Sequence, residues 1–174
     1  MGRQQVERFD ALVLPHLDQA YTLARHLLRD EHDAQDAVQD ASLRALRHFD
    51  GFRGGDARAW FLAIVRNCCL TSHRRHRTDR ASVPLDDDHV SAIDEMRPTD
   101  AGAIERSERE AIERAVSALP QEYREAIILR EIQELSYAQI SEVVGVPIGT
   151  VMSRLSRARR RLAQALGGGV QEAS

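Results

Sequence analysis

Apolar residues recur at steps of three and four along almost the whole chain, which is the spacing that places side chains on one face of an α-helix. In the first stretch, Phe9, Leu12, Leu17, Tyr21 and Leu28 follow this spacing and predict one long helix. The same reasoning predicts further helices over residues 31–49, 56–77, 104–119, 121–133, 136–144 and 148–166. No strand-like alternation of apolar and polar residues persists, so we expect an all-α fold.

The helical period is lost between the third and the fourth predicted helix. Residues 78–103 gather Pro84, Pro98, Gly102 and the acidic run at 86–88, which is the composition of a linker. The chain has 174 residues, of which 43% are apolar, enough for one ordinary domain or two small ones. We therefore predict two small helical domains at residues 1–77 and 104–166, a flexible acidic linker over 78–103 and a flexible tail over 167–174.

The C-terminal part has the layout of a helix-turn-helix: a short helix, a tight turn and a longer helix. Ser136 suits the N-cap of the short helix, and Gly145 suits the left-handed position that ends it. Pro147 stands just inside the predicted start of the longer helix, where its missing N–H costs least. The predicted buried stripe of the longer helix consists of Val151, Leu155, Ala158, Leu162 and Leu166.

Charge is divided into blocks of opposite sign, which the formal net charge of −3 conceals. Residues 30–40 carry five acids and no arginine, and residues 78–104 carry seven acids and two arginines. Residues 53–77 carry six arginines and one acid, and residues 150–166 carry five arginines and no acid. Blocks separated this sharply suggest that different faces of the protein bind different partners.

The longer helix of the helix-turn-helix keeps its basic residues outside the predicted buried stripe. Such a helix is able to enter the major groove of DNA and to contact the flanking phosphates. A merely solvated face is the alternative, but five arginines without a balancing acid are unusual for it. The candidate DNA-binding residues are Thr150, Ser153, Arg154, Arg157, Arg159, Arg160 and Arg161.

The third predicted helix combines aromatic residues with arginines, and a glycine-containing loop precedes it. Aromatic rings interleaved with arginines are able to stack unpaired bases and to hold a nucleic-acid backbone. The alternative for Trp60 and Phe61 is ordinary core packing, and we favour that alternative for Phe61.

An acidic stripe runs along the second predicted helix. Asp33, Asp36 and Asp40 stand at positions i, i+3 and i+7, so their carboxylates share one face. Like charges at this spacing repel one another slightly. The stripe is therefore either a solvated face or the docking surface of a basic partner.

Several classes of protein are excluded. The apolar runs are too short to insert in a membrane, and the charged N-terminus lacks a signal peptide, which predicts a cytoplasmic protein. Cys68 and Cys69 are neighbours and would form a poor disulfide. Cys69, His73 and His76 share a helix face, but they lack a fourth ligand and lie among arginines, so we predict no metal site. The chain contains no recognised catalytic motif, so neither an enzyme nor a cofactor is predicted.

Taken together, the motifs resemble those of the extracytoplasmic-function (ECF) sigma factors, the compact class of bacterial transcription initiation factor. Residues 9–77 are similar to sigma region 2 through Asp33-Ala34-x-Asp36-x-x-Gln39-Asp40-x-x-Leu43-Arg44-Ala45, Phe52-Arg53-Gly54, Trp60-Phe61 and Arg66-Asn67. Residues 104–166 are similar to region 4 through Leu119-Pro120, Tyr123-Arg124, Leu135-Ser136-Tyr137, Ile140 and Pro147-x-Gly149-Thr150-Val151-x-Ser153-Arg154-Leu155-x-Arg157-Ala158-Arg159. Two motif sets in this order, separated by an acidic linker, are highly specific for this family.

The resemblance implies a partner for each charged block. The acidic stripe is expected to dock on the coiled coil of the β′ subunit of core RNA polymerase, and the β subunit is a further expected contact. The third helix and the loop before it are expected to recognise and open the −10 promoter element without ATP, and the helix-turn-helix to read the −35 element. An anti-sigma factor is expected to cover both domains. The implied polymerase-binding residues are Asp33, Asp36, Gln39 and Asp40, and the implied −10 residues are Phe52, Arg53, Trp60, Arg66, Asn67, Arg74 and Arg75.

Three features depart from the family pattern: Met152 stands where Lys or Arg is often found, Thr71 stands where Asp is common, and the Cys68-Cys69 pair is not part of the pattern. Two rival functions stay open. A sigma-like protein would sequester an anti-sigma factor without initiating transcription. A helix-turn-helix repressor would dimerise on two half-sites, and the acidic stripe has no role in it.

Overall fold

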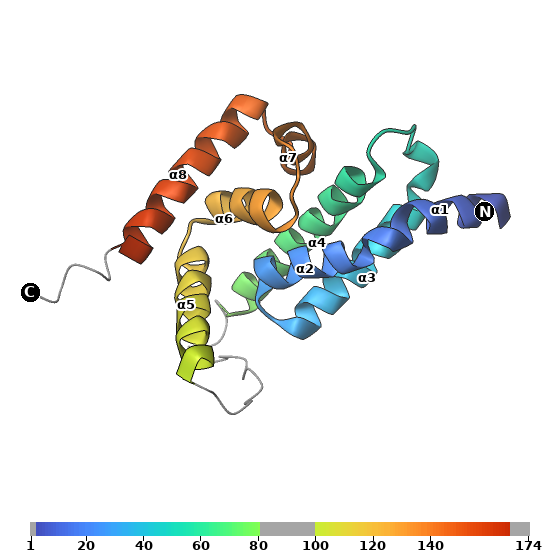
Figure 1. Cartoon of the computed structure of the whole chain (residues 1–174). Coiled ribbons are helices and arrows are strands. Elements are labelled where there is room, and N and C mark those ends of the chain that lie inside the picture. The colour runs from blue at the N-terminus through green and yellow to red at the C-terminus, as the bar shows by residue number, and fades with distance from the viewer. Residues whose placement is uncertain (1–2, 81–99, 168–174) are drawn as a thin grey trace, which may run out of the picture.

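The computed structural model describes the backbone of residues 3–80 and 100–167, and these residues form an all-α fold in two helical units (Figure 1). The N-terminal unit contains α1 (Arg3–Val13), η1 (Leu14–His16), α2 (Leu17–Leu28), α3 (Glu31–Arg47), η2 (Phe49–Gly51) and α4 (Ala57–Arg80). The C-terminal unit contains α5 (Asp100–Ser117), α6 (Gln121–Ile127), a π-helical turn (Ile128–Ile132), α7 (Tyr137–Val144) and α8 (Ile148–Gly167). Residues 81–99, which make up most of the predicted linker, lie outside the described residues.

The prediction of one long helix over residues 9–28 is wrong, because the α-helix is interrupted at Pro15. Helix α1 ends at Val13, and Pro15 lies in the 3₁₀ turn that connects it to α2. Proline has no N–H to donate, and its ring clashes with the carbonyl group four residues earlier. The apolar spacing continues across this break, and for that reason the pattern alone suggested a single helix.

Small side chains let the helices of the N-terminal unit pack closely. Helix α3, which Asp30 caps by accepting a hydrogen bond from the Asp33 N–H at 2.9 Å, packs against α2 and α4. Its buried side chains are all alanines, and α4 contributes larger buried residues, among them Phe61 with no exposed surface. The prediction that Phe61 belongs to the core is confirmed. The buried alanines are Ala34, Ala37, Ala41 and Ala45.

The caps predicted for the helix-turn-helix are present. Ser136 accepts a hydrogen bond from the Gln139 N–H, and the Gln139 side chain accepts one from the Ser136 N–H, so the two form a capping box. Gly145 ends α7 with a φ of +75°, a left-handed conformation that suits glycine. Pro147 immediately precedes α8 rather than lying inside it.

Burial along α8 decreases toward its C-terminal end. Val151, Leu155 and Ala158 are buried, Leu162 is partly buried, and Leu166 is 41% exposed. The prediction that Leu166 belongs to the buried stripe is therefore wrong, because the last turns of α8 are not covered to the same extent. In the described part of the chain, no helix combines the length and the apolar content needed to cross a membrane.

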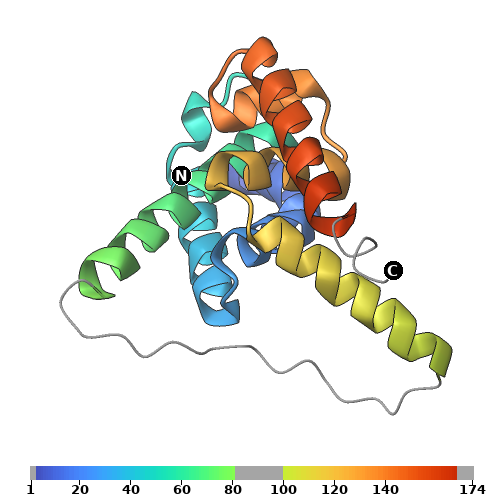
Figure 2. The same ribbon diagram turned by 90° about the vertical axis from the view of Figure 1, so that its left-hand side faces the viewer.

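The two units pack against each other. Helix α7 contacts α4, and the π-helical turn contacts α2, while the far ends of α4 and α5 diverge (Figure 2). One cluster of buried hydrophobic residues includes members of both units. The sequence predicted two domains joined by a linker and gave no indication of this contact.

Two glycines flanking the turn of the helix-turn-helix are expected to respond in opposite ways to the same substitution. Gly145→Ala places a Cβ in left-handed backbone and should lower the free energy of unfolding by about 1 kcal/mol. Gly149 lies within α8, with no positive φ and open space around its Cα, so Gly149→Ala should raise that free energy by about 0.4–1 kcal/mol. Urea denaturation of the two variants measures both changes, and equal effects would contradict the left-handed conformation of residue 145.

Candidate nucleic-acid and partner-binding surfaces

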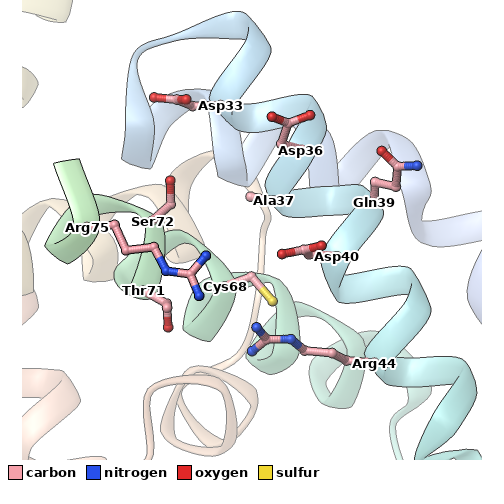
Figure 3. A pocket seen from close by; sticks show the side chains of 10 residues that line it. All are labelled: Asp33, Asp36, Ala37, Gln39, Asp40, Arg44, Cys68, Thr71, Ser72 and Arg75. Carbon is pink, nitrogen blue, oxygen red and sulfur yellow. The ribbon is translucent and has the colours of Figure 1, made fainter. Parts of the chain in front are cut away.

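The acidic stripe of α3 borders a hollow between α3 and α4, which we call the α3–α4 hollow (Figure 3). Its volume is about 290 Å³. Asp36, Gln39 and Asp40 are exposed, and Asp33 is partly buried. The structure thus brings together the four residues predicted to bind the polymerase. The complete lining is Asp33, Asp36, Ala37, Gln39, Asp40, Arg44, Cys68, Thr71, Ser72 and Arg75.

The α4 side of this hollow was not predicted from the sequence. Arg75, which we predicted to contact −10 DNA, extends from α4 toward the acidic side chains, and Arg44 lies at the other end (Figure 3). The hollow therefore combines three carboxylates with two guanidinium groups. Carboxylates accept hydrogen bonds from the guanidinium or ammonium groups of a basic partner. No local signal in the sequence places residues of α4 beside residues of α3 that precede them by about 30 positions.

The two cysteines are buried and free. Burial raises the pKa of Cys68, which lines the α3–α4 hollow; nearby Arg44 lowers that pKa and Asp40 raises it. Burial raises the pKa of Cys69 to about 12, and the electrostatic interaction with the neighbouring Cys68 contributes a smaller part of this rise. Both thiols are therefore protonated at neutral pH. Within the side chains that the structure describes, no group of three or more potential metal ligands converges, and the side chain of His76 lies outside them.

Two aromatic residues predicted to contact the −10 element belong to a ring cluster at the start of α4. The centroids of Phe52 and Trp60 are 4.9 Å apart, and Phe52 stacks on Phe49 at 6.0 Å with an interplanar angle of 18°. Phe9 meets Phe49 edge-on at 5.4 Å. Phe52 and Trp60 remain partly exposed as residues.

The polar residues predicted for the −10 element fall into two groups. Arg53, Asn67, Arg74 and Arg75 are exposed. Arg66, in contrast, faces the C-terminal unit, where its Nε and Nη2 donate to Oε2 of Glu125 at 3.0 and 2.8 Å. The structure therefore gathers the predicted residues along α4 and the loop before it, but engages one of them in the chain's own ion pair.

The arginines of α8 differ in what they contact. Arg159 donates to Glu131 at 2.8 Å, and this hydrogen bond raises the pKa of Arg159. The guanidinium carbon of Arg161 lies 5.3 Å from the ring centroid of Tyr123, a cation–π contact. Thr150 and Arg154 are partly buried. The side chains of Ser153, Arg157 and Arg160 are exposed, on the side of α8 opposite Val151 and Leu155.

Comparison with known proteins identifies the class of the chain. Residues 12–78 match the family model for sigma-70 region 2, and residues 109–162 match the model for sigma-70 region 4. Two relatives are the ECF RNA polymerase sigma factors SigM of Mycobacterium tuberculosis and SigE of Mycolicibacterium smegmatis. SigM is 39% identical over 160 residues, which cover 91% of this chain and 77% of SigM. SigE is 35% identical over 156 residues, which cover 88% of this chain and 60% of SigE.

Two solved structures resemble this one over nearly its whole length. The sigma factor RpoE of Bartonella quintana, bound to the anti-sigma factor NepR, superposes with a TM-score of 0.72 at 29% identity, over 95% of this chain and 99% of RpoE. CnrH, in complex with the cytosolic domain of CnrY, has a TM-score of 0.67 at 25% identity, over 96% and 91% of the two chains. The chain is a sigma-70 type protein with regions 2 and 4. Within that class it belongs to the ECF RNA polymerase sigma factors.

The burial of the two thiols predicts slow chemical modification. With a pKa of about 12, Cys69 is about 10⁻⁴ thiolate at pH 8, so iodoacetamide should alkylate it roughly 1,000-fold more slowly than an ordinary thiol. Cys68 should also react slowly, and both should react at ordinary rates in denaturant. Mass spectrometry of the alkylated chain measures this, with Ser156→Cys as the control because Ser156 is exposed on α8. Rapid labelling of Cys69 in the folded chain would contradict its burial.

Proposed function

We propose that the chain binds core RNA polymerase and directs it to promoters that carry matched −10 and −35 elements, as a non-enzymatic initiation factor acting in the cytoplasm. One observation carries this proposal: region 2, with its acidic hollow, and region 4, with its arginine-bearing helix, occur in this order in one ECF sigma chain. A repressor has no role for the acidic hollow, and a decoy that does not bind promoters has no need of the arginines at 154, 157 and 159.

The α3–α4 hollow is the proposed docking site for core polymerase. Three carboxylates and the Gln39 amide are able to receive the basic side chains of a partner helix, which we take to be the β′ coiled coil. Complementary charge of this kind chiefly speeds association and fixes the register of docking. Arg44 and Arg75 at the same hollow would in turn pair with acidic residues of the partner, which selects a partner of mixed charge.

Helix α4 and the loop before it are the proposed −10 site. Opening the duplex costs a few kcal/mol for each base that leaves the stack, and stacking on exposed aromatic rings returns about 1–3 kcal/mol per base. Phe52 and Trp60 supply the rings, and Arg53, Asn67 and Arg74 supply backbone contacts. Strand separation in this scheme is driven by binding energy and needs neither ATP nor a cofactor.

Helix α8 is the proposed −35 reader, with Ser153, Arg157 and Arg160 at the centre of its exposed face. Arg159 and Arg161 would hold α8 in place through their contacts with Glu131 and Tyr123. The β subunit is the further polymerase contact that we propose for this unit. An anti-sigma factor is a proposed inhibitor, because the similar sigma factor RpoE was solved in complex with the anti-sigma factor NepR.

The proposed function is tested by transcribing fragmented genomic DNA of the source organism with its purified core polymerase, with and without this chain, and sequencing the RNA 5′ ends. Start sites that depend on the chain and share two spaced upstream elements are the expected result. A folded chain that produces no new start sites would contradict initiation and favour the sequestering decoy.

Charge reversal in the α3–α4 hollow should weaken polymerase binding. Replacing Asp36 and Asp40 together by Arg inverts the sign of the docking surface while leaving the buried alanines of α3 in place. We expect at least a tenfold rise in the Kd for core polymerase, measured by fluorescence titration. The control is Asp10→Arg with Asp18→Arg, two exposed acids on α1 and α2 that produce the same net charge. Equal loss in both double variants would contradict the docking assignment.

Loss of Arg157 should weaken recognition of the −35 element. Arg157→Ala removes an exposed guanidinium from α8 and should cost about 1–3 kcal/mol on the −35 duplex if that group contacts a base. Fluorescence anisotropy on the native and a scrambled duplex separates base contacts from phosphate contacts, since only the former depend on sequence. Arg109→Ala in α5 removes the same charge outside α8 and serves as the control. An equal loss on both duplexes would assign Arg157 to the phosphate backbone.

A further inference from the structure

The two units meet along an interdomain seam that contains charged and polar side chains from both. From the N-terminal unit, Arg58 donates to the backbone carbonyl of Gln133, and Asp56 accepts from the Gln139 side chain. Burial acts to raise the pKa of Asp56, but hydrogen bonds from the Ala59 N–H and the Gln139 side chain outweigh it and hold the pKa below its ordinary value. Asp56 is therefore charged, and the seam includes charge-assisted hydrogen bonds.

The ion pair between Arg66 and Glu125 lies at the centre of our inference. Two nitrogens of Arg66 donate to Oε2 of Glu125, and Gln121 donates to Oε1 at 3.1 Å. The Glu125 side chain is 2% exposed and the Arg66 side chain 16%. Removing one partner of a buried ion pair leaves an uncompensated charge, whereas separating the two units returns both partners to water. The pair therefore favours either a fully closed or a fully open seam.

Glu125 engages two donors of Arg66 that are chemically able to bind a phosphate. The Nε and Nη2 atoms form the fork that binds carboxylate and phosphate oxygens alike. Arg66 lies one residue before Asn67, which is exposed on the same helix. A strand that follows α4 past Asn67 therefore reaches Arg66 only when Glu125 has moved away.

Unsatisfied polar atoms at the seam lower the cost of opening it. Three buried atoms, Arg58 Nε, Arg124 Nε and Gln133 Oε1, have no hydrogen-bond partner in the described part of the chain. An unsatisfied buried polar atom destabilises the closed arrangement, and opening the seam returns that atom to water. The shared hydrophobic cluster opposes opening. These opposing contributions are what a reversible two-state contact requires.

We propose that the structure is a closed state in which the C-terminal unit withholds part of the −10 surface, and that a phosphate of the single-stranded −10 DNA displaces Glu125 from Arg66 and opens the seam. This inference rests on the proposed function of α4. Because only open molecules bind the strand at Arg66, the apparent affinity equals the affinity of the open state multiplied by the fraction of molecules that are open. The exposed side chain of Asn67 provides an initial contact before the seam opens.

The first test removes the charge of Glu125 from the full chain. Glu125→Gln keeps the shape of the side chain but weakens its hold on Arg66, and we expect an affinity about fivefold higher for short fluorescein-labelled single-stranded DNA of random sequence. Glu122→Gln is the matched control, because Glu122 lies exposed on the same helix and its loss changes the net charge equally. Adding Arg66→Ala to Glu125→Gln should abolish the gain. Equal affinity of the two glutamine variants would overturn the proposal.

The second test holds the seam closed without altering Glu125. Arg29 donates to the backbone carbonyl of Ser117 across the seam, so Arg29→Cys and Ser117→Cys can be bridged by a short bismaleimide. The bridged chain should bind the strand about fivefold more weakly than the same chain capped with a monofunctional maleimide. Unchanged affinity after bridging would refute the closed state. Because the bridged chain keeps Glu125, this test stays valid even if Glu125→Gln lowers the melting temperature of the protein.

The failure of this inference and the failure of the proposed function are separable. If start-site sequencing gives chain-dependent promoters while neither test changes strand affinity, only the closed state is overturned. If no variant binds the strand and no start sites appear, the proposed function is overturned together with the closure that depends on it.

Discussion

The close packing of α3 against α4 is the constraint on which the candidate surfaces depend. Alanines on the inner face of α3 bring the helix close to α4, and larger residues such as Phe61 fill the space that remains. The acidic residues of α3 and Arg75 of α4 then come together at one hollow instead of on separate faces. The ring cluster at the start of α4 is positioned by the same packing. The surfaces that we propose for a protein partner and for nucleic acid in region 2 are thus two sides of a single helix pair.

The second organising feature is the seam between the units. It joins residues that lie 59 positions apart in the pair of Arg66 with Glu125. A residue that we assign to promoter binding is therefore also a structural residue of the isolated chain. If Arg66 binds promoter DNA as we propose, this dual use couples the arrangement of the units to nucleic-acid binding, since the same guanidinium cannot satisfy both partners. RpoE and CnrH resemble this chain over nearly its whole length, so the similarity includes both units.

Local signals in the sequence predicted what local physics determines. The caps at Ser136 and Gly145, the burial of Phe61 and the acidic stripe of α3 all follow from spacing and side-chain chemistry. Pro15 shows the limit of periodicity, because apolar spacing continues through a proline that the backbone cannot accommodate in a helix. The partners of Arg159 and Arg161 come from α6 and the π-helical turn, and no spacing rule on α8 indicates them. Contacts between distant segments, above all the seam, had no sequence signature to find.

The π-helical turn after α6 has a geometric consequence for the whole C-terminal unit. A π-helical turn contains about one residue more than an α-helical turn, so the chain leaves it rotated by about 100° relative to an uninterrupted helix. The Gln133 N–H donates to the Ile128 carbonyl at 3.0 Å across this wider turn, and the chain then reverses into α7. Deletion of an apolar residue here, such as Ile128, would leave every charge in place and would nonetheless point α8 in another direction. The direction of α8 is thus fixed by residue count as well as by residue type.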